Sequence, residues 1–482
     1  MTSSGTTHGF SLKGQGLKCD DSDSIDQHLK PLKDDDDVEL VVVGGNTFGV
    51  GACERLGEVL KDKKKLIEAD LADIFTGRLI SEIPQSLSSL CNSLLNLQNL
   101  TVVDLSDNAF GGRCVDAMVP FLSSHLPLEE LRLANNGLGP AGATVIANAL
   151  YDLGLKSKGL GQPSRLRKII CGRNRCENGS TVAWGKVFEI HSELTEVRLF
   201  QNDIRNHGWA PIMEGLSHCS KLQVLDMWDN TATEKGSKSV AKALPKLKNL
   251  KELNLGDCLL RPRGGAMIAR ALKLGNNAGL EHLKLSGSEI DEEVVGLLVE
   301  FVKSHGSKLK KVELNDNFGD SEAAEELSGV WGAMKGALDD WKNGAELDEL
   351  DAIIEKDSDD EEGESGSEEE GSEEENDDKS TDEEDKKKGT EEEDEKKGTE
   401  KQDEENTPVK KLTDLEVGSS KEQAKPEDLV KAADVFEEPK LDLKTEESSS
   451  SSSTAPAKKE NKSKEEALID LMNQTIEAFK IG

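Results

Sequence analysis

Residues 128–138 read LEELRLANNGL, and this stretch decides the fold. Its leucines alternate with polar residues over the first half, and an asparagine follows three residues after the last leucine of that half. The same template, LxxLxLxxNxL, fits residues 194–204, 222–232 and 250–260, and looser copies begin at residues 38, 66, 100, 166, 280 and 309. The starts of successive copies lie 28, 34, 28, 38, 28, 28, 28, 30 and 29 residues apart. Self-similarity at such a period indicates one structural unit repeated along the chain.

Each copy combines two hydrophobic periods. It begins with a short apolar alternation, which is the pattern of a strand. About 15 residues later a helical pattern follows, as in GPAGATVIANAL (139–150) and GSKSVAKALPKL (236–247). A single unit of this size cannot bury its apolar face alone, so neighbouring units must stack. We therefore predict an α/β leucine-rich repeat solenoid of the ribonuclease-inhibitor-like type, with a curved parallel sheet.

Two copies depart from the period. The step after Leu128 is ten residues longer than 28 and contains YDLGLKSKGLGQPS (151–164), which we predict to be a surface loop rich in glycine and lysine. The step after Leu66 is six residues longer, and Ile74 stands there in place of the usual asparagine. Because Gly77 and Arg78 follow this broken repeat, we expect a loop shaped for something other than stacking.

The asparagine position of the template is expected to be structural. Its amide can bond to backbone groups at the bend after the strand that would otherwise stay unpaired. Asn136 is therefore assigned to a buried ladder, whereas Asn135 should point away from the core, to solvent or to a partner. Cys258 and Ser288 replace the asparagine in two copies, and the position is otherwise filled by Asn46, Asn108, Asn136, Asn174, Asn202, Asn230 and Asn317.

Net charge divides the chain into two regions of different composition. Residues 344–482 hold 48 Asp and Glu against 20 Lys, whereas residues 1–343 hold 47 acidic against 40 basic residues. Such an acidic chain is a poor candidate for nucleic acid, and a basic protein partner fits better. We predict an N-terminal segment at 1–34, the repeat domain at 35–343, an acidic disordered region at 344–406, a low-complexity linker at 407–464 and a short amphipathic helix at 465–482.

The acidic region allows two interpretations. Residues 346–378 contain 19 acidic residues and one lysine, too little apolar area to offset ordering entropy. They form either a solubilising tail or a polyanion that complements a basic partner. Four serines, at 358, 365, 367 and 372, have an acid three residues later, a context for acidophilic kinases. Lys444, in LKTE, fits a SUMO-attachment pattern, although four-residue matches are common by chance; the helix at 465–482 either docks to a partner or frays.

Other classes of protein find no support in the sequence. The eight cysteines form no CxxC pair, so we expect free core thiols in a reducing compartment. The histidines show no metal spacing such as HExxH, and no GxxxxGK[ST] phosphate loop is present. The first residues lack a signal-peptide core, and no apolar run reaches the ~18 residues of a membrane helix. We expect a soluble intracellular protein without a metal or cofactor of its own.

Several short stretches that the repeat template does not require resemble one family. DIFTGRLISEIP (73–84), LSDNAFG (105–111), NNGLGPAGA (135–143) and IICGRNRCENGS (169–180), with the acidic run after the last repeat, are similar to the Ran GTPase-activating proteins. The resemblance covers roughly residues 35–378. It implies an activator, with no nucleotide site of its own, that binds Ran in the GTP state and supports nucleocytoplasmic transport. GTP and magnesium would be held by Ran.

The resemblance also implies roles for individual residues. Asn135 matches the family's asparagine that holds the catalytic glutamine of Ran, in place of an inserted arginine finger. Arg78 matches the important arginine of FTGR and is assigned to supporting the interface. From repeat geometry alone we expect further partner contacts along the same edge from Asn108, Arg173, Arg175, Asn202, Trp228 and Asp229.

The resemblance further implies a cytoplasmic location and contacts with nuclear-transport factors, with attachment at the nuclear envelope or pore left open. Two rival functions remain. One is a non-catalytic repeat scaffold, and the other is an acidic chaperone of basic nuclear proteins.

Overall fold

A computed structural model describes residues 8–317 and 321–348 of the chain. All described elements belong to one structural unit, Met1–Gly371. The acidic region from residue 349 onward, the linker at 407–464 with Lys444, and the predicted helix at 465–482 lie outside the described residues. Those three assignments stay predictions.

The described strands form one long parallel sheet and one short one. The long sheet holds 12 strands in chain order, and each strand pairs in register with the next. They are β1 (Gly9–Ser11), β3 (Leu40–Val42), β5 (Glu68–Asp70), β6 (Val102–Asp104), β7 (Glu130–Arg132), β8 (Lys168–Ile170), β9 (Glu196–Arg198), β10 (Val224–Asp226), β11 (Glu252–Asn254), β12 (His282–Lys284), β13 (Lys311–Glu313) and β14 (Glu346–Leu347). The short sheet pairs β2 (Lys18–Cys19) with β4 (Thr47–Phe48).

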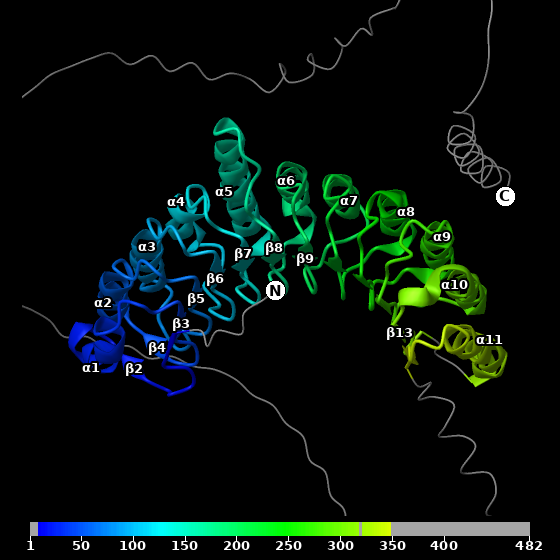
Figure 1. Cartoon of the computed structure of the whole chain (residues 1–482), viewed down its shortest axis with the longest axis horizontal. Coiled ribbons are helices and arrows are strands. Elements are labelled where there is room, and N and C mark those ends of the chain that lie inside the picture. The colour runs from blue at the N-terminus through cyan, green and yellow to red at the C-terminus, as the bar shows by residue number, and fades with distance from the viewer. Residues whose placement is uncertain (1–7, 318–320, 349–482) are drawn as a thin grey trace, which may run out of the picture. The chain divides into compact units, whose positions relative to one another are not determined.

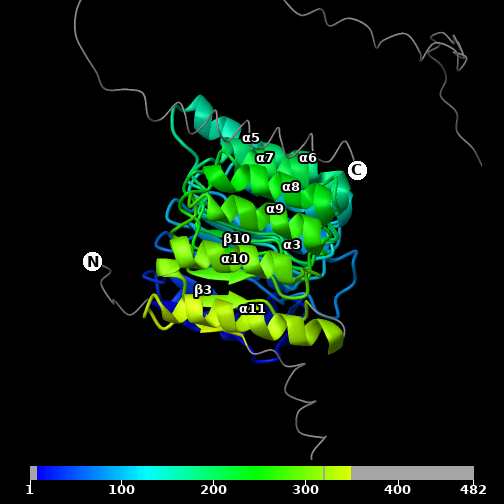
Figure 2. The ribbon, with the colours of Figure 1, turned by 90° about the vertical axis from the view of Figure 1, so that its right-hand side faces the viewer.

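Helices cover one face of the long sheet. Figure 1 shows them along the outer side of the curved array, with the strands along the inner side, and Figure 2 shows successive helices side by side. They are α1 (Ser22–Lys33), α2 (Val50–Leu60), α3 (Ile83–Leu94), η1 (Val115–Met118), α4 (Val119–Leu122), α5 (Gly139–Gly159), α6 (Glu177–Ile190), α7 (Trp209–Leu216), α8 (Thr233–Ala243), η2 (Leu244–Lys246), α9 (Arg261–Lys273), α10 (Glu292–His305), η3 (Gly306–Lys308) and α11 (Ser321–Asp339). The predicted leucine-rich repeat solenoid is confirmed.

The leucines of the template fill the space between the two layers. In the template copy at 128–138, which contains β7, Leu131 and Leu133 are each 1% exposed, and Leu128 is fully buried. Each such leucine contributes about 2 kcal/mol relative to an exposed side chain. In each of the ten predicted copies the strand begins two residues after the predicted start. The sequence period therefore locates every strand of the long sheet from β3 to β13.

The solenoid extends beyond both predicted boundaries. β1 pairs with β3 in parallel register, and α1 packs against α2, so the segment at 1–34 is part of the repeat array where it is described. At the other end β14 pairs with β13 beyond residue 343. The predicted limits of 35 and 343 are wrong because these end strands carry few leucines. Phe10 and Leu12 fill the core beside β1 instead.

The insertion after Leu128 is mostly a helix, which corrects the predicted surface loop. α5 runs for 21 residues, through Gly159, and Figure 1 shows it projecting past its neighbours. Leu153, Gly154 and Ser157 continue the buried stripe of this helix, so the helical period persists through the inserted residues. The lysines and glycines of this stretch had favoured the prediction of a loop over that of a helix.

A buried histidine anchors the base of this long helix. The His191 ring contacts the Leu150 carbonyl oxygen through Nε2 at 2.8 Å and the Ser164 hydroxyl through Nδ1 at 2.7 Å. Since the carbonyl can only accept, Nε2–H donates and Nδ1 accepts from the hydroxyl. Burial lowers the pKa of His191 to about 4. The native state therefore holds this ring neutral.

We expect His191 to make folding stability fall as the pH drops. The unfolded pKa is about 6.5. A depressed native pKa gives stability that is complete above that value and is lost as pH falls toward about 4. The loss should reach about 3 kcal/mol in the free energy of unfolding. Urea titrations at pH 7 and pH 4.5 should show a smaller difference for His191→Gln than for the unaltered chain. Equal differences would contradict this assignment.

The remaining chemistry of the described residues is that of a packed core. All eight cysteines are free and buried, as predicted. Among the described residues, no group of three or more His, Cys, Asp and Glu side chains is arranged to hold a metal ion. No helix in residues 8–317 and 321–348 is long and apolar enough to cross a membrane.

Candidate functional site

The template asparagines form a continuous ladder along the edge where the strands end. The Asn136 amide nitrogen donates to the carbonyl oxygens of Leu105 and Leu133 at 2.9 and 3.0 Å. Its amide oxygen accepts from the backbone N–H of Asn108 at 2.9 Å. Each asparagine thus bonds its own turn and the turn before it. Asn136 is fully buried, and its predicted structural role is confirmed.

The ladder tolerates smaller groups at two rungs, as predicted. The Ser288 hydroxyl donates to the Leu255 carbonyl at 2.7 Å. The Cys258 thiol contacts the Met227 carbonyl at 3.2 Å. At the broken repeat Ile74 supplies no amide, but its own backbone N–H still donates to the Asn108 side chain at 2.8 Å. The backbone course is therefore kept where the asparagine is missing.

Two of the residues expected to contact a partner belong to this ladder instead. Asn108 is 2% exposed, and Asn202 is fully buried. The Asn202 amide donates to the carbonyls of Cys171 and Leu199, and its oxygen accepts from the Asn174 backbone. The prediction that these two side chains contact a partner was wrong, because their amide groups already form hydrogen bonds inside the repeat stack.

An exposed row runs beside the ladder, one residue earlier in each repeat. All ten of its members have a positive φ, between 50° and 74°. We call these residues the outer row: Gly45, Asp73, Asp107, Asn135, Arg173, Gln201, Asp229, Asp257, Gly287 and Asp316. Glycine, asparagine and aspartate tolerate this left-handed conformation best. The backbone therefore favours the residue types found at most of these positions, a signal that alternation alone did not reveal.

Asn135 is the one asparagine of the outer row. Its side chain is exposed, as predicted, with φ at 57°. One amide hydrogen is donated to the Asp107 carboxylate at 2.9 Å. Within the described residues nothing donates to its amide oxygen. Asn135 thus presents one acceptor and one free N–H from a side chain whose orientation Asp107 fixes.

Arg173 and Gln201 depart from the conformational preference of the outer row. They adopt φ values of 56° and 52°, which cost more for side chains of this kind. The Arg173 Nε donates to Gln201 at 2.5 Å, and Gln201 donates to Asp229 at 2.8 Å. Trp228, half-buried, donates its indole N–H to Asp257 at 2.6 Å. Hydrogen bonds therefore connect the exposed side chains of this edge.

The predicted contacts other than Asn108 and Asn202 do reach the surface. Arg173, Arg175 and Asp229 are exposed, and Trp228 is partly exposed. All four follow the carboxyl ends of β8 and β10, on the same edge as Asn135, which follows β7. A partner lying along this edge could meet all of them.

Arg78 lies in the loop after β5 and points into the protein. Its guanidinium pairs with the Asp20 carboxylate and donates to the carbonyls of Cys19 and Thr47 at 3.2 and 3.0 Å. The side chain is only 12% exposed. It therefore joins the β5 loop to the two-stranded sheet of β2 and β4. Since β5, β6 and β7 are neighbours in a parallel sheet, this loop leaves the same edge as Asn135, with about 10 Å between the two strand ends.

We expect Arg78→Ala to loosen the N-terminal repeat. Loss of the guanidinium removes a donor from the Thr47 carbonyl and the Asp20 carboxylate, and one of two donors from the Cys19 carbonyl, which should cost about 2 kcal/mol. Hydrogen exchange of residues 8–33 should accelerate, while exchange beyond β8 should not change. Asp20→Ala removes the ion pair alone and should produce a weaker effect in the same residues. Unchanged exchange in residues 8–33 would show that Arg78 does not hold this repeat.

Two exposed apolar residues follow Arg78. Leu79 is 66% exposed and Ile80 is 49% exposed. Neither residue was predicted as part of the site, since only Gly77 and Arg78 marked this loop in the sequence. Their position in a repeat that is six residues longer than the usual 28, without a core role, was the available signal. They lie on the loop that Arg78 fixes.

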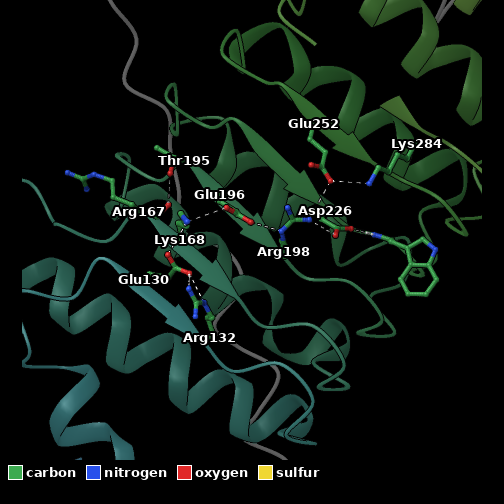
Figure 3. Close-up of polar contacts among 11 residues, drawn as sticks. Glu130, Arg132, Arg167, Lys168, Thr195, Glu196, Arg198, Asp226, Glu252 and Lys284 are labelled. Carbon is green, nitrogen blue, oxygen red and sulfur yellow. Dashed lines mark hydrogen bonds and ion pairs between the residues drawn. The ribbon is translucent and has the colours of Figure 1, made fainter. Parts of the chain in front are cut away.

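The inner face of the sheet carries an ion network that largely neutralises itself. Figure 3 shows its central part, where Arg198 pairs with Glu196 at 2.5 Å, Asp226 at 3.0 Å and Glu252 at 3.5 Å. Burial raises the pKa of Asp226 above its usual value, with Arg198 acting against that rise. The remaining pairs join Glu68, Asp104 and Glu130 to Arg132, Glu130 and Glu196 to Lys168, and Glu252 to Lys284. These charges hold neighbouring strands together.

Comparison with known proteins gives the same fold and points to one family. A family model described as "Leucine Rich repeat" matches residues 96–118 and 125–147. The chain is 36% identical over 317 residues to Ran GTPase-activating protein 1 of Saccharomyces cerevisiae, a match that covers 64% of this chain and 78% of the yeast protein.

Animal proteins of the same name match over shorter stretches. Ran GTPase-activating protein 2 of Caenorhabditis elegans is 41% identical over 202 residues, which is 41% of this chain and 21% of that protein. Ran GTPase-activating protein 1 of Xenopus laevis is 37% identical over 198 residues, which is 40% of this chain and 34% of that protein. The matches therefore span about a fifth and about a third of these two relatives.

Proposed function

The chain belongs to the family of Ran GTPase-activating proteins, and from this premise we propose that it binds GTP-bound Ran and accelerates GTP hydrolysis there. Three features support a partner site at the loop edge of the sheet. Asn135 is exposed beside a buried ladder, Arg78 fixes a loop on the same edge, and four further polar or aromatic side chains lie along it. The activity would then serve nucleocytoplasmic transport.

Asn135 is the residue that we propose acts on the reaction. A GTPase hydrolyses GTP slowly until the glutamine that orients the attacking water is held in place. The free amide oxygen and N–H of Asn135 can accept from and donate to the amide of that glutamine. Because Asp107 already fixes the side chain, little rotational freedom remains to be lost when the glutamine arrives.

Arg78 supports the site from behind and is not an inserted finger. Its guanidinium has three internal partners and would have to break them to reach a phosphate. The loop that it fixes presents Leu79 and Ile80, which we propose pack against an apolar part of Ran. Arg173, Arg175, Trp228 and Asp229 are proposed as further contacts along the same edge.

The nucleotide and its metal ion are proposed to belong to the partner. GTP and magnesium would stay in the site of Ran, and this chain would add only positioning groups to it. It therefore acts as an activator without a nucleotide site of its own. We propose a cytoplasmic location, where hydrolysis would discharge Ran leaving the nucleus, with contacts to nuclear-transport factors. Anchoring at the nuclear envelope or pore is the remaining alternative.

Single-turnover GTP hydrolysis by Ran, measured with and without this protein, tests the proposal. Activators of this class raise the rate by roughly a thousand-fold or more. Binding of Ran without acceleration would favour the rival repeat scaffold. A chaperone of basic nuclear proteins would be indicated if residues 344–482 bound histones and the chain neither bound nor activated Ran.

A further inference from the structure

A strongly basic ridge crosses the helix-bearing side of this acidic protein. Residues 233–274, which include α8 and α9, contain ten Lys and Arg against three acidic residues. Five lysines lie on α8 and in the turn that follows it, and all five are exposed. We call them the lysine ridge: Lys235, Lys238, Lys242, Lys246 and Lys248. Figures 1 and 2 show α8 next to α9. The arginines of α9, Arg261, Arg263 and Arg270, are also exposed, but each is paired with a glutamate and so adds less free charge.

Among the described residues, four of the five lysines of the lysine ridge have no ion-pair partner. Lys242 pairs with Glu214 at 3.3 Å, and both side chains are more than half exposed, so the pair is worth little. Lys246 contacts only the Ser217 hydroxyl, at 3.2 Å. Within the described residues no carboxylate lies within ion-pair distance of Lys235, Lys238 or Lys248. Concentrated like charges raise the energy of the fold, so the lysine ridge is suited to binding a polyanion.

We infer that the occupant of the lysine ridge is the acidic segment of the same chain, residues 349–370. That segment holds 12 acidic residues and one lysine, Lys356. The charges of the two elements are complementary, and covalent attachment gives the segment an effective concentration on the order of millimolar. Three serines of the segment, at 358, 365 and 367, precede acids by three residues, so phosphorylation there would strengthen the contact.

The length of the segment allows it to reach the ridge. The described chain ends at Asp348, directly after β14, and α8 follows β10, four strands away in the sheet. With helix axes roughly 10 Å apart, the distance along the helix layer is about 40 Å. Twenty-two residues span at most about 70 Å when fully extended, which exceeds this distance.

The consequence is competition for one polyanion. The same acids cannot lie on the lysine ridge and on a basic surface of a partner at the same time. The contact itself does not depend on the proposed function, because it can be measured with no GTPase present. Release of the segment would then be a step of partner binding only if the proposed function holds.

Energy transfer between two dyes on the full chain tests the contact. The eight native cysteines are buried, and burial raises the pKa values of Cys53, Cys91 and Cys219 to about 12, so dyes will react with introduced thiols. Ser220→Cys places one dye at an exposed position beside the ridge, where the Ser220 carbonyl accepts from Asn249. Ser367→Cys places the other dye in the acidic segment. We expect high transfer at about 50 mM salt and at least a two-fold decrease at about 500 mM.

Charge reversal at the ridge supplies the decisive comparison. The triple variant Lys235→Glu, Lys238→Glu and Lys242→Glu should lower transfer at least two-fold at low salt. A matched triple variant, Lys186→Glu, Lys303→Glu and Lys308→Glu, changes the net charge equally at exposed lysines of α6, α10 and η3 and should keep the transfer. Equal transfer in the two triple variants would overturn the inference, whether the common value is high or low. Circular dichroism confirms that both variants are folded.

Discussion

Removing the Asn135 amide is expected to reduce the stimulated rate of GTP hydrolysis on Ran by roughly 100-fold, the effect of losing one positioning group in a transition state. Asn135→Gly is the cleanest change. Glycine adopts the φ of 57° without strain, whereas alanine would add a conformational cost of about 1 kcal/mol. The affinity for GTP-bound Ran should change less than ten-fold. Single-turnover hydrolysis at saturating activator separates the two quantities.

A second position of the outer row provides the control. Asp257 has nearly the same backbone angle, φ of 52°, and also exposes its side chain. Asp257→Gly should leave the rate of hydrolysis in the complex unchanged. If Asn135→Gly lowered only affinity, Asn135 would be an ordinary contact. If it changed neither quantity, the asparagine at this position would be explained only by its tolerance of the left-handed backbone conformation.

Asn202→Ala is expected to destabilise the fold by about 4 kcal/mol. The amide donates to the carbonyls of Cys171 and Leu199 at 2.8 and 3.0 Å and accepts from the Asn174 backbone at 3.0 Å. Alanine would leave the Cys171 carbonyl and the Asn174 N–H buried and unpaired, at about 1–3 kcal/mol for each, whereas the Asn230 amide would still donate to the Leu199 carbonyl at 3.0 Å. Urea unfolding followed by circular dichroism measures the loss.

Two substitutions test the reason for that loss. Asn202→Ser should cost about half as much, since Ser288 shows that a hydroxyl keeps one carbonyl satisfied at this kind of rung. Gln201→Ala, one residue earlier and only partly buried, should change the free energy of unfolding by less than about 1 kcal/mol. A loss for Asn202→Ala no larger than that of Gln201→Ala would refute the ladder assignment.

The repeat period located the strands because leucine burial and strand geometry impose it directly. Every predicted copy places its leucines in the core, and the asparagine at its end bonds its own turn and the turn before it wherever the residue is present. The period failed where other residues do the same work. Phe10 fills the core at β1 without a leucine pattern, and β14 ends the sheet beyond the last template match. The insertion was misread because lysine and glycine outweighed a helical stripe that continues through Leu153 and Ser157.

The candidate site was only partly accessible from the sequence. Alternation correctly predicted that Asn136 is buried and Asn135 exposed, because neighbouring residues face opposite ways at the end of a strand. It could not show that Arg78 points inward to Asp20, 58 residues earlier in the chain, since that contact depends on how the first two repeats stack. Asn108 and Asn202 occupy the asparagine position of the template, so their burial in the ladder could have been predicted from the sequence.

The ladder has a mechanical consequence. Each rung bonds the turn before it as well as its own turn, so a turn in the middle of the array is held from two sides, and a terminal turn from one. Stretched between its two ends, the array should therefore peel from its extremities inward. Each event would release one period, which for 28 residues is about 95 Å of contour length. The central turns that carry Asn135 and Arg173 would be the last to come apart.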